Sequence, residues 1–323
     1  MPIHQRPRRN RSSHQVRDMV AETVVDRKKL IMPHFILEGE RLREQIMSMP
    51  GISRVSSDNL LRDLESDYKL GIDKILLFGI PDTKDEEASG AYDRNGVVQL
   101  ALREIKKHLP GILVITDVCL CEYMSHGHCG VVDNGEILND PSLELLARTA
   151  LSHAESGADM VAPSDMMDGR VRAIRDRLDA GGFDDLPILS YSAKYASAFY
   201  GPFREAAGSA PQFGDRSTYQ MDCRNAIEAG KEVLLDIEEG ADIVMVKPAL
   251  SYLDVIYRIR NLVDVPLCAY NVSGEYAMVK AMAKLGYGDE ERLVKEIMNS
   301  IFRAGADMVI SYHTRDIYRN SWF

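Results

Sequence analysis

Three segments of the chain are near copies, and each joins an amphipathic stretch to a short apolar run through Gly-Ala-Asp. They are ESGADMVAPS (155–164), EEGADIVMVKP (238–248) and RAGADMVISYH (303–313). Before each one, apolar residues recur at three- and four-residue steps, which predicts a helix with one buried face. Glycine can end such a helix because it adopts positive φ without a Cβ clash. The apolar run that follows is typical of a parallel strand buried on both faces.

Weaker versions of the same unit fill the rest of the chain. Apolar runs follow helical stretches in GIDKILLFGIP (71–81), ILVITDV (112–118), LPILSYSAK (186–194) and VPLCAYNVSG (265–274), and LIMPHFIL (30–37) is a further run. Together with the three near copies they predict eight strands. Eight such units in 323 residues favour an α/β fold of the (β/α)8 barrel type. An open doubly wound sheet is the alternative, but the first turns lack the Gly-x-Gly-x-x-Gly phosphate loop.

Composition narrows the class of protein. Hydrophobic residues make up 45% and charged residues 27% of the chain, which is typical of a globular protein in water. No apolar run approaches the ~20 residues of a membrane span, and the N-terminus has no signal-like apolar region. The five cysteines are an odd number in a long chain, which favours a reducing cytoplasm over a disulfide framework. We expect a cytoplasmic protein that does not bind a membrane.

The first residues form a basic arm on an acidic chain. The net charge is −10, yet residues 1–20 carry five arginines and one aspartate. Such an arm can bind nucleic acid, serve as a transit peptide or pack on a neighbouring subunit. Two prolines disfavour the amphipathic helix of a transit peptide, and the body shows no basic face for nucleic acid. We therefore expect residues 1–25 to be an assembly arm and residues 26–323 to be one barrel domain.

Two lysines follow buried apolar runs. Lys194 ends ILSYSAK and Lys247 ends IVMVK, and active sites of these barrels form at the carboxyl ends of the strands. A single lysine there can simply extend to water. Two in one narrow mouth disfavour each other's charge, and burial adds to that effect. A neutral lysine amine attacks ketones to form a Schiff base, so the pair predicts carbonyl chemistry.

The stretch DVCLCEYMSHGHCG (117–130) holds Cys119, Cys121 and Cys129. It follows the strand expected at 112–118 and therefore lies at the same end of the barrel. Three thiolates leave a fourth zinc position open, which is the arrangement of a catalytic metal site. Reduced cysteines packed in a loop are the alternative. His126 and His128 are further possible ligands or hydrogen-bond donors, whereas Cys223 and Cys268 are expected to lie outside the cluster, Cys268 in the core.

A long segment without a clear period follows Lys194. Residues 195–221 are rich in glycine, alanine, serine and aromatic residues, and loops of this length are usually functional lids. Arg204 and Arg216 lie within it, and guanidinium groups match carboxylates geometrically. We expect the two to clamp a substrate carboxylate, with solvated loop arginines as the alternative.

The motifs DVCLCEYMSHGHCG, APSDMMDGRV, SYSAKYASAFYGPFREAAGS, GDRSTYQM, MVKPALSYLD and YNVSGEYAM resemble those of the porphobilinogen synthase (5-aminolevulinate dehydratase) family, from about residue 30 to the C-terminus. The resemblance implies condensation of two 5-aminolevulinate molecules into porphobilinogen with loss of two waters, for tetrapyrrole biosynthesis. It implies Lys247 as the principal Schiff-base lysine and Lys194 as the second. It also implies catalytic Zn²⁺ on the three cysteines, although Glu122 stands where many members have proline.

The same resemblance implies the remaining site residues. Arg204, Arg216, Ser273 and Tyr312 match substrate-binding residues, and we expect further substrate contacts from Asp117, Ser164, Tyr200, Gln220 and Tyr270. A regulatory Mg²⁺ would bind Glu232, with Asp168 in its outer shell. The implied assembly is a homo-octamer formed by arm exchange. Two alternatives stay open: another Schiff-base aldolase-type barrel enzyme, which needs no metal, and a non-catalytic zinc-storing barrel, for which loss of either lysine would be expected.

Overall fold

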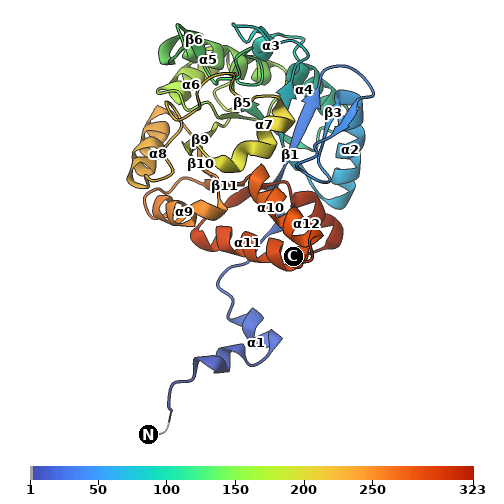
Figure 1. The fold of residues 1–323 in the computed structure, drawn as a ribbon, viewed down its shortest axis with the longest axis vertical. Coiled ribbons are helices and arrows are strands. Elements are labelled where there is room, and N and C mark those ends of the chain that lie inside the picture. The colour runs from blue at the N-terminus through green and yellow to red at the C-terminus, as the bar shows by residue number, and fades with distance from the viewer. Residues whose placement is uncertain (1–2) are drawn as a thin grey trace.

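Eight parallel strands form the barrel in a computed structural model that describes residues 3–323 (Figure 1). The prediction of eight strands is confirmed, and their bounds are β1 (Leu30–Leu37), β4 (Lys74–Ile80), β5 (Leu113–Val118), β8 (Met160–Pro163), β9 (Leu189–Lys194), β10 (Ile243–Lys247), β11 (Leu267–Asn271) and β12 (Met308–Ser311). They are hydrogen-bonded in the order β8-β5-β4-β1-β12-β11-β10-β9. A single bridge between Val161 and Ile188 joins the two ends of this order.

Helices surround the strands as an outer ring (Figure 1). They are α2 (Ser57–Leu70), α4 (Val97–His108), α5 (Asn139–Glu155), α6 (Arg170–Ala180), α8 (Ile227–Glu239), α9 (Leu253–Arg260), α10 (Ser273–Lys284), α11 (Glu290–Ala304) and α12 (Thr314–Asn320). Short helical segments lie between these elements, among them α3 (Ser89–Tyr92), η2 (Arg27–Lys29) and η4 (Leu250–Tyr252). The strands are almost fully buried between the barrel interior and these helices, as expected of a parallel sheet covered on both faces.

The Gly-Ala-Asp repeat has a structural cause. Its glycines, Gly157, Gly240 and Gly305, all have φ between 101° and 116°, as the sequence predicts for the residue that ends each helix. The aspartates have a second role that the sequence did not indicate. In each copy the carboxylate accepts a hydrogen bond from a backbone N–H at the start of the preceding strand: Asp159 from Val114 (2.6 Å), Asp242 from Ile188 (2.8 Å) and Asp307 from Leu267 (2.8 Å). The repeat therefore fixes where neighbouring strands begin.

Two small antiparallel additions decorate the barrel and were not predicted. β2 (Arg43–Gln45) pairs with β3 (Ser53–Ser56), which also pairs with β1. β6 (Val131–Asp133) pairs with β7 (Glu136–Leu138) directly after the cysteine stretch. Within residues 3–323, no helix combines the length and the apolar character that crossing a bilayer requires.

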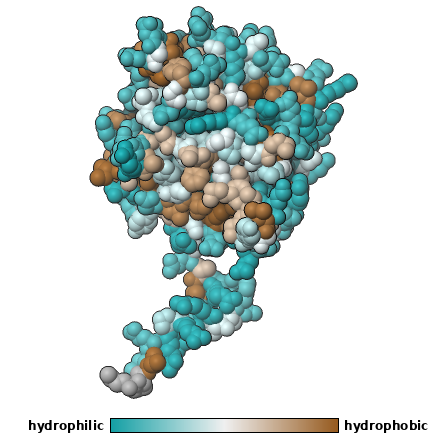
Figure 2. All heavy atoms as spheres, viewed as in Figure 1, coloured by the Kyte–Doolittle hydropathy of each residue, from teal (hydrophilic) through white to brown (hydrophobic). Residues whose placement is uncertain are grey.

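The N-terminal arm extends away from the barrel (Figure 1). It contains a short 3-10 helix, η1 (Pro7–Arg11), and α1 (His14–Met19), whose N-cap Ser13 accepts a hydrogen bond from Val16. Residues 1 and 2 lie outside the described residues. The arm surface is largely hydrophilic (Figure 2), but Met19 and Val24 are exposed by about four-fifths.

The lid segment, residues 195–221, differs from the irregular loop expected. It contains η3 (Ala198–Tyr200) and α7 (Gly201–Ala207), and α7 lies across the centre of the barrel face seen in Figure 1. Phe203, Ala206 and Ala207 of this helix are buried against the barrel. A helix of two turns is too short to show a reliable period in sequence, which explains the difference.

Candidate active site

Lys194 and Lys247 end neighbouring strands. They are paired residues in the ladder between β9 and β10, and only 4% and 5% of their surfaces are exposed. The two amines share one aromatic neighbour, Tyr191, whose ring centroid lies 5.6 Å from Nζ of Lys194 and 4.9 Å from Nζ of Lys247. Both predicted lysines therefore meet in the mouth of the barrel.

Burial, together with the positive charge of Lys194, lowers the pKa of Lys247 to about 7. Desolvation and a neighbouring cation both disfavour an ammonium group. A substantial fraction of the Lys247 amine is therefore neutral near pH 7. This is the protonation state that nucleophilic attack on a carbonyl requires.

Lys194 lies in a different environment. Its ammonium donates a hydrogen bond to the carbonyl oxygen of Ser164. Burial lowers its pKa, but negative charge on Cys129, Cys119 and Cys121 outweighs that effect and raises the pKa above its usual value. Lys194 consequently remains a cation beside the neutral amine of Lys247.

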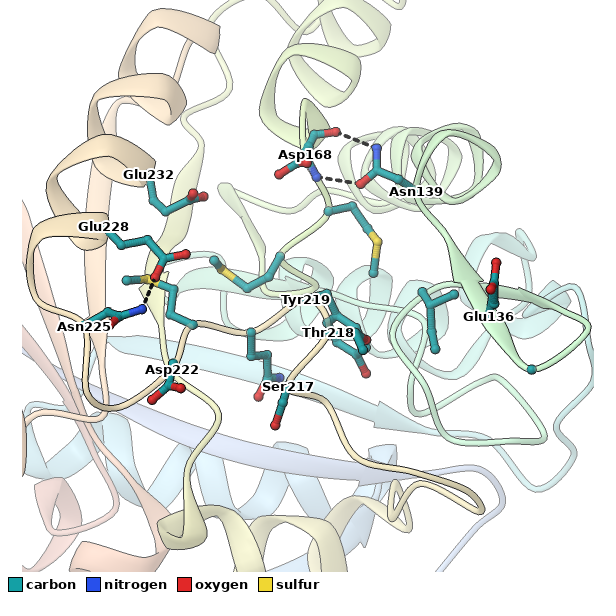
Figure 3. Close-up of a pocket in the computed structure, with 16 residues that line it drawn as sticks. Glu136, Asn139, Asp168, Ser217, Thr218, Tyr219, Asp222, Asn225, Glu228 and Glu232 are labelled. Carbon is teal, nitrogen blue, oxygen red and sulfur yellow. Dashed lines mark hydrogen bonds between the residues drawn. The ribbon is translucent and has the colours of Figure 1, made fainter.

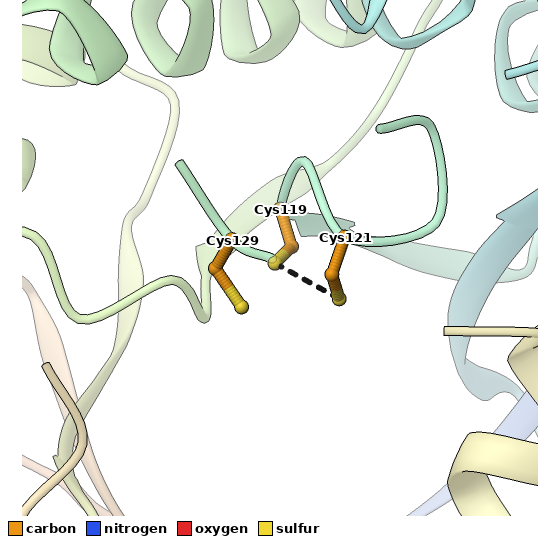
Figure 4. Close-up of side chains that lie close together, drawn as sticks. All are labelled: Cys119, Cys121 and Cys129. Carbon is orange, nitrogen blue, oxygen red and sulfur yellow. Dashed lines mark hydrogen bonds between the residues drawn. The ribbon is translucent and has the colours of Figure 1, made fainter. Parts of the chain in front are cut away.

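The three predicted cysteines converge. Cys119, Cys121 and Cys129 are buried, and their sulfur atoms all lie within 4.8 Å of one another (Figure 4). Sγ of Cys119 is 3.4 Å from Sγ of Cys121. Hydrogen bonds from these two cysteines, with the charges of Arg216 and Lys194 nearby, hold the pKa of Cys129 well below its usual range. Three convergent soft donors fit a thiophilic cation such as Zn²⁺.

The other two cysteines lie elsewhere, as the sequence predicts. Cys268 is buried within β11, and Cys223 is exposed. Glu122 is a buried carboxylate next to the cluster, because its Oε2 accepts a hydrogen bond from Sγ of Cys121 at 3.2 Å. Burial raises the pKa of Glu122 to about 8, and the negative charge of Cys121 contributes.

The cysteine loop, residues 119–130, and the lid segment hold each other in place. Arg216 donates to the carbonyl oxygens of Gly127 (3.0 Å) and Ser209 (2.6 Å). His128 contacts the carbonyl oxygen of Phe213 through Nε2 at 3.0 Å and the hydroxyl of Tyr219 through Nδ1 at 3.1 Å. His126 and His128 thus lie against the lid, and neither belongs to the three-sulfur group.

The lid presents unpaired donors to the mouth. Arg216 is 4% exposed and Arg204 is about half-buried. Among the described residues, Nε of each arginine has no hydrogen-bond partner. Burial lowers the pKa of Arg204, and so does the neighbouring charge of Arg216. One buried and one half-buried guanidinium group, each with an unpaired Nε, form a site for an anion.

Gln220 and Asp117 also carry free polar atoms. Both side-chain amide atoms of Gln220 and Oδ1 of Asp117 are buried without a partner in the described part of the chain. The other oxygen of Asp117 accepts a hydrogen bond from Ser164 at 3.1 Å. Buried polar atoms usually have partners, so these atoms are available to a bound ligand.

The remaining predicted site residues already have protein partners. Ser273 accepts a hydrogen bond from the backbone N–H of Phe203 at 3.0 Å, which ties α10 to the lid helix. The hydroxyls of Tyr270 and Tyr312 are 3.0 Å apart. Tyr200 donates to the carbonyl oxygen of Lys247 at 3.1 Å. The rings of Tyr200 and Tyr270 lie near the amine of Lys247, and Tyr312 and Ser273 contact residues of this group.

Asp168 and Glu232 line a cavity of about 650 Å³, which Gln220 of the lid segment also lines (Figure 3). The cavity also contains Glu228 and Asp222, so it is acidic. Burial raises the pKa of Glu232. Asn139 holds the backbone of Asp168 by accepting from its N–H at 2.7 Å and donating to its carbonyl oxygen at 3.0 Å. The two carboxylates predicted for magnesium therefore face the same space.

Two aromatic residues beside Lys247 were not predicted as site residues. Tyr191 and Phe203 are buried, and each ring lies about 5 Å from the lysine nitrogen. Aromatic residues in buried strands and helices usually belong to the core. The one sequence signal for a functional role is that both residues lie within ten positions of Lys194.

Comparison with known proteins gives one consistent result. The family model for delta-aminolevulinic acid dehydratase matches residues 4–320. The delta-aminolevulinic acid dehydratase of Synechococcus elongatus is 55% identical over 322 residues, covering 98% of each chain. That of Archaeoglobus fulgidus is 53% identical and covers 97% of this chain and 96% of its own.

A solved structure agrees with the sequence comparisons. The delta-aminolevulinic acid dehydratase (porphobilinogen synthase) of Toxoplasma gondii ME49, crystallised with the reaction product porphobilinogen, superimposes with a TM-score of 0.96. It is 46% identical to this chain, and the match covers 98% of this chain and 92% of that one.

Proposed function

The chain belongs to the delta-aminolevulinic acid dehydratase family, and we propose that it works as a porphobilinogen synthase through a Schiff base on Lys247. The reaction joins two 5-aminolevulinate molecules into porphobilinogen and releases two waters, a step of tetrapyrrole biosynthesis. The observation that carries the proposed mechanism is the pairing of two buried lysines with opposite pKa shifts, the pKa of Lys247 being lowered to about 7 while that of Lys194 is raised.

The lowered pKa makes Lys247 the nucleophile. Its neutral amine attacks the ketone carbon of one substrate molecule, and the carbonyl oxygen leaves as water. Lys194 keeps its charge, which favours a neutral amine on Lys247, and its charge interacts both with that amine and with the three cysteines. We assign Lys194 to the second substrate molecule.

The substrate carboxylate is assigned to the lid. Arg204 and Arg216 have free Nε donors, and a carboxylate accepts two parallel hydrogen bonds from a guanidinium group. The unpartnered amide of Gln220 and Oδ1 of Asp117 offer further contacts, and Ser164, Tyr200, Ser273, Tyr270 and Tyr312 are assigned to the walls around the substrates. Arg216 also donates a hydrogen bond to the cysteine loop. The same side chain would therefore bind the substrate carboxylate and hold the lid against this loop.

The cysteine group is assigned to Zn²⁺. Three buried sulfur donors within 4.8 Å leave one position free for an oxygen of the substrate. Bound there, the ion would supply Lewis-acid polarisation of that oxygen. Cys119, Cys121 and Cys129 would hold it, and Oε2 of Glu122 lies 3.2 Å from Sγ of Cys121.

The acidic cavity is assigned to a regulatory Mg²⁺. Magnesium prefers oxygen ligands and keeps several of its waters. Glu232 would contact the ion directly and Asp168 through water, since both line the cavity together with Glu228 and Asp222. The cavity is bounded by α8 and by the loop after β8, so an ion there connects a surface helix with residues near Ser164.

Assembly into an octamer is assigned to the N-terminal arm. Met19 and Val24 are exposed on the arm, Met278 and Met282 are exposed on α10, and Leu285 is exposed directly after α10. Apolar residues on an extended arm favour packing on another subunit. Deleting residues 1–25 should reduce the mass measured by light scattering, and an unchanged oligomer would contradict the assignment.

The cysteines are free, which suits a reducing compartment such as the cytoplasm.

A single assay tests the proposed activity. Purified protein incubated with 5-aminolevulinate should produce porphobilinogen, detected colorimetrically, and a chelator should abolish the product until Zn²⁺ is restored. Failure to form porphobilinogen in the presence of Zn²⁺ would contradict the proposal.

A further inference from the structure

Four aromatic rings surround the amine of Lys247. Its Nζ lies 4.5 Å from the ring centroid of Tyr270, 4.9 Å from Tyr191, 5.1 Å from Phe203 and 5.2 Å from Tyr200. The rings come from two strands and from the lid segment, so the arrangement exists only in the folded barrel with the lid in place. All four distances are within the range in which a cation is attracted by a ring face.

The cage, defined as Tyr191, Tyr200, Phe203 and Tyr270, presents ring faces to the amine and makes no hydrogen bond with it. Among the described residues, Nζ of Lys247 makes no hydrogen bond, and its interactions with Lys194 and Asp117 are through charge alone. Nζ of Lys194, by contrast, donates to the carbonyl oxygen of Ser164 and has one ring nearby. The two amines therefore lie in different kinds of environment.

The surroundings of the Lys247 nitrogen suit an iminium better than an ammonium group. An ammonium group carries three N–H donors that need acceptors when buried. An iminium carries a single N–H, and its positive charge is shared with the attached carbon. When the neutral amine bonds to the ketone carbon, the C–O bond breaks, one proton is taken up overall and one water is released, leaving the positive iminium. A site of ring faces that makes no hydrogen bond with the amine is poor for the first cation and good for the second.

We propose that the cage of Tyr191, Tyr200, Phe203 and Tyr270 stabilises the iminium formed on Lys247, so that these rings are functional residues of the reaction. This inference rests on the proposed Schiff base at Lys247. It explains why Lys247, and not the hydrogen-bonded Lys194, is the principal site of condensation.

Contacts within the protein hold three of the four rings, those of Tyr200, Tyr270 and Phe203, in position. The hydroxyl of Tyr200 bonds to the carbonyl oxygen of Lys247, and that of Tyr270 contacts Tyr312. Phe203 lies edge-on to Phe78 at 5.0 Å and tilted against Phe35 at 5.7 Å. Fixed dipoles and quadrupoles aimed at a developing charge require no rearrangement during the reaction.

Fluorination of Phe203 tests the cage with little change of shape. Each fluorine withdraws electron density from the ring face and weakens its attraction for a cation. Phenylalanine, 4-fluoro-, 3,5-difluoro- and 3,4,5-trifluorophenylalanine are incorporated at position 203. The probe is 4-oxopentanoate, the substrate without its amino group, which can form the iminium but cannot complete the condensation.

The readout is the apparent Kd of the probe, from the fraction of full-length protein that carries a borohydride-reduced adduct on Lys247. It is measured by mass spectrometry at about pH 8.5, where the amine is mostly neutral. The Kd should rise stepwise along the series, by roughly five- to thirtyfold in total. The same series at Phe78, which is buried against Phe203 but is not among the rings over Lys247, should leave it unchanged.

The results distinguish failure of the aromatic cage from failure of the Schiff base on Lys247. A flat series at Phe203, with adduct still on Lys247, would overturn the cage and leave the proposed function intact. An equal rise at Phe78 would likewise overturn it, because the effect would then reflect packing. The absence of any adduct in the unsubstituted protein would contradict the Schiff base itself, and the cage with it.

Discussion

Lys194 and Lys247 face each other across neighbouring parallel strands, each as the last residue of its strand. Strand pairing alone fixes this relationship, because paired residues on adjacent strands lie side by side. Because both amines are buried, the positive charge of one disfavours a charge on the other. The negative charge of the cysteines favours the cation on Lys194, so Lys247 is the amine that becomes neutral. The chemistry therefore follows from strand register as much as from the identity of the side chains.

Removing Lys194 should change the pH dependence of the reaction. Lys194→Met deletes the cation that lowers the pKa of Lys247, so this pKa should rise from about 7 by roughly one to two units. Because the neutral amine is the reactive form, the acidic limb of the kcat profile should move to higher pH by the same amount. The loss of the second substrate site should also lower kcat on the order of a hundredfold.

Full pH profiles of both enzymes check this prediction. Lys231→Met, at an exposed position on α8, serves as a control and should keep the parent profile. A Lys194→Met profile that moves to lower pH, or does not move, would show that Lys194 does not control the amine of Lys247.

The cysteine group should account for bound zinc. Cys121→Ala removes one of three donors, and the two that remain hold Zn²⁺ poorly. We expect loss of stoichiometric zinc by metal analysis and loss of nearly all activity. Cys223→Ala, at the exposed cysteine, should retain both. Full activity in metal-free protein would be incompatible with the assignment.

The lid arginines should act on substrate affinity. Arg204→Lys and Arg216→Lys each keep the charge but lose the planar pair of donors. KM should rise by roughly tenfold or more in each, as expected for a lost charge-assisted hydrogen bond, with a smaller effect on kcat. Arg224→Lys is a matched control, because Arg224 is exposed and paired with Asp222. Normal KM in both lid variants would rule out a clamp.

Stimulation by magnesium should depend on the acidic cavity. Glu232→Ala removes the direct ligand proposed for Mg²⁺, so the variant should keep its zinc requirement and lose stimulation by added Mg²⁺. Glu238→Ala, also on α8 but exposed, should respond like the parent. Activity titrations with Mg²⁺ at fixed Zn²⁺ make the measurement. A Glu232→Ala enzyme that is stimulated like the parent would show that the ion binds elsewhere.

The parts of the molecule that the sequence predicts are those with a repeated local pattern. The barrel was predictable because each unit repeats an amphipathic stretch, a glycine turn and an apolar run, as at Gly157 and Gly240. The lysines and cysteines were predictable because polar side chains directly after buried strands must lie at one end of the barrel.

Features that depend on tertiary contacts were not predictable in this way. The pairing of β6 with β7 and the short helix α7 have no distinctive period. Tyr191 and Phe203 are typical core residues by sequence, and only the folded chain brings their rings around one nitrogen together with that of Tyr270. Glu122 was noticed as a departure from the family motif, but its contact with Cys121 is seen only in the structure.

The central claim is that Lys247 forms the Schiff base with the substrate, and reduction of that Schiff base with borohydride tests it most directly. Protein treated with borohydride in the presence of 5-aminolevulinate, digested and examined by peptide mass spectrometry, should carry the reduced adduct on the peptide that contains Lys247. Lys247→Met should lose this adduct together with essentially all activity. An active Lys247→Met enzyme, or an adduct found only on another residue, would contradict the account.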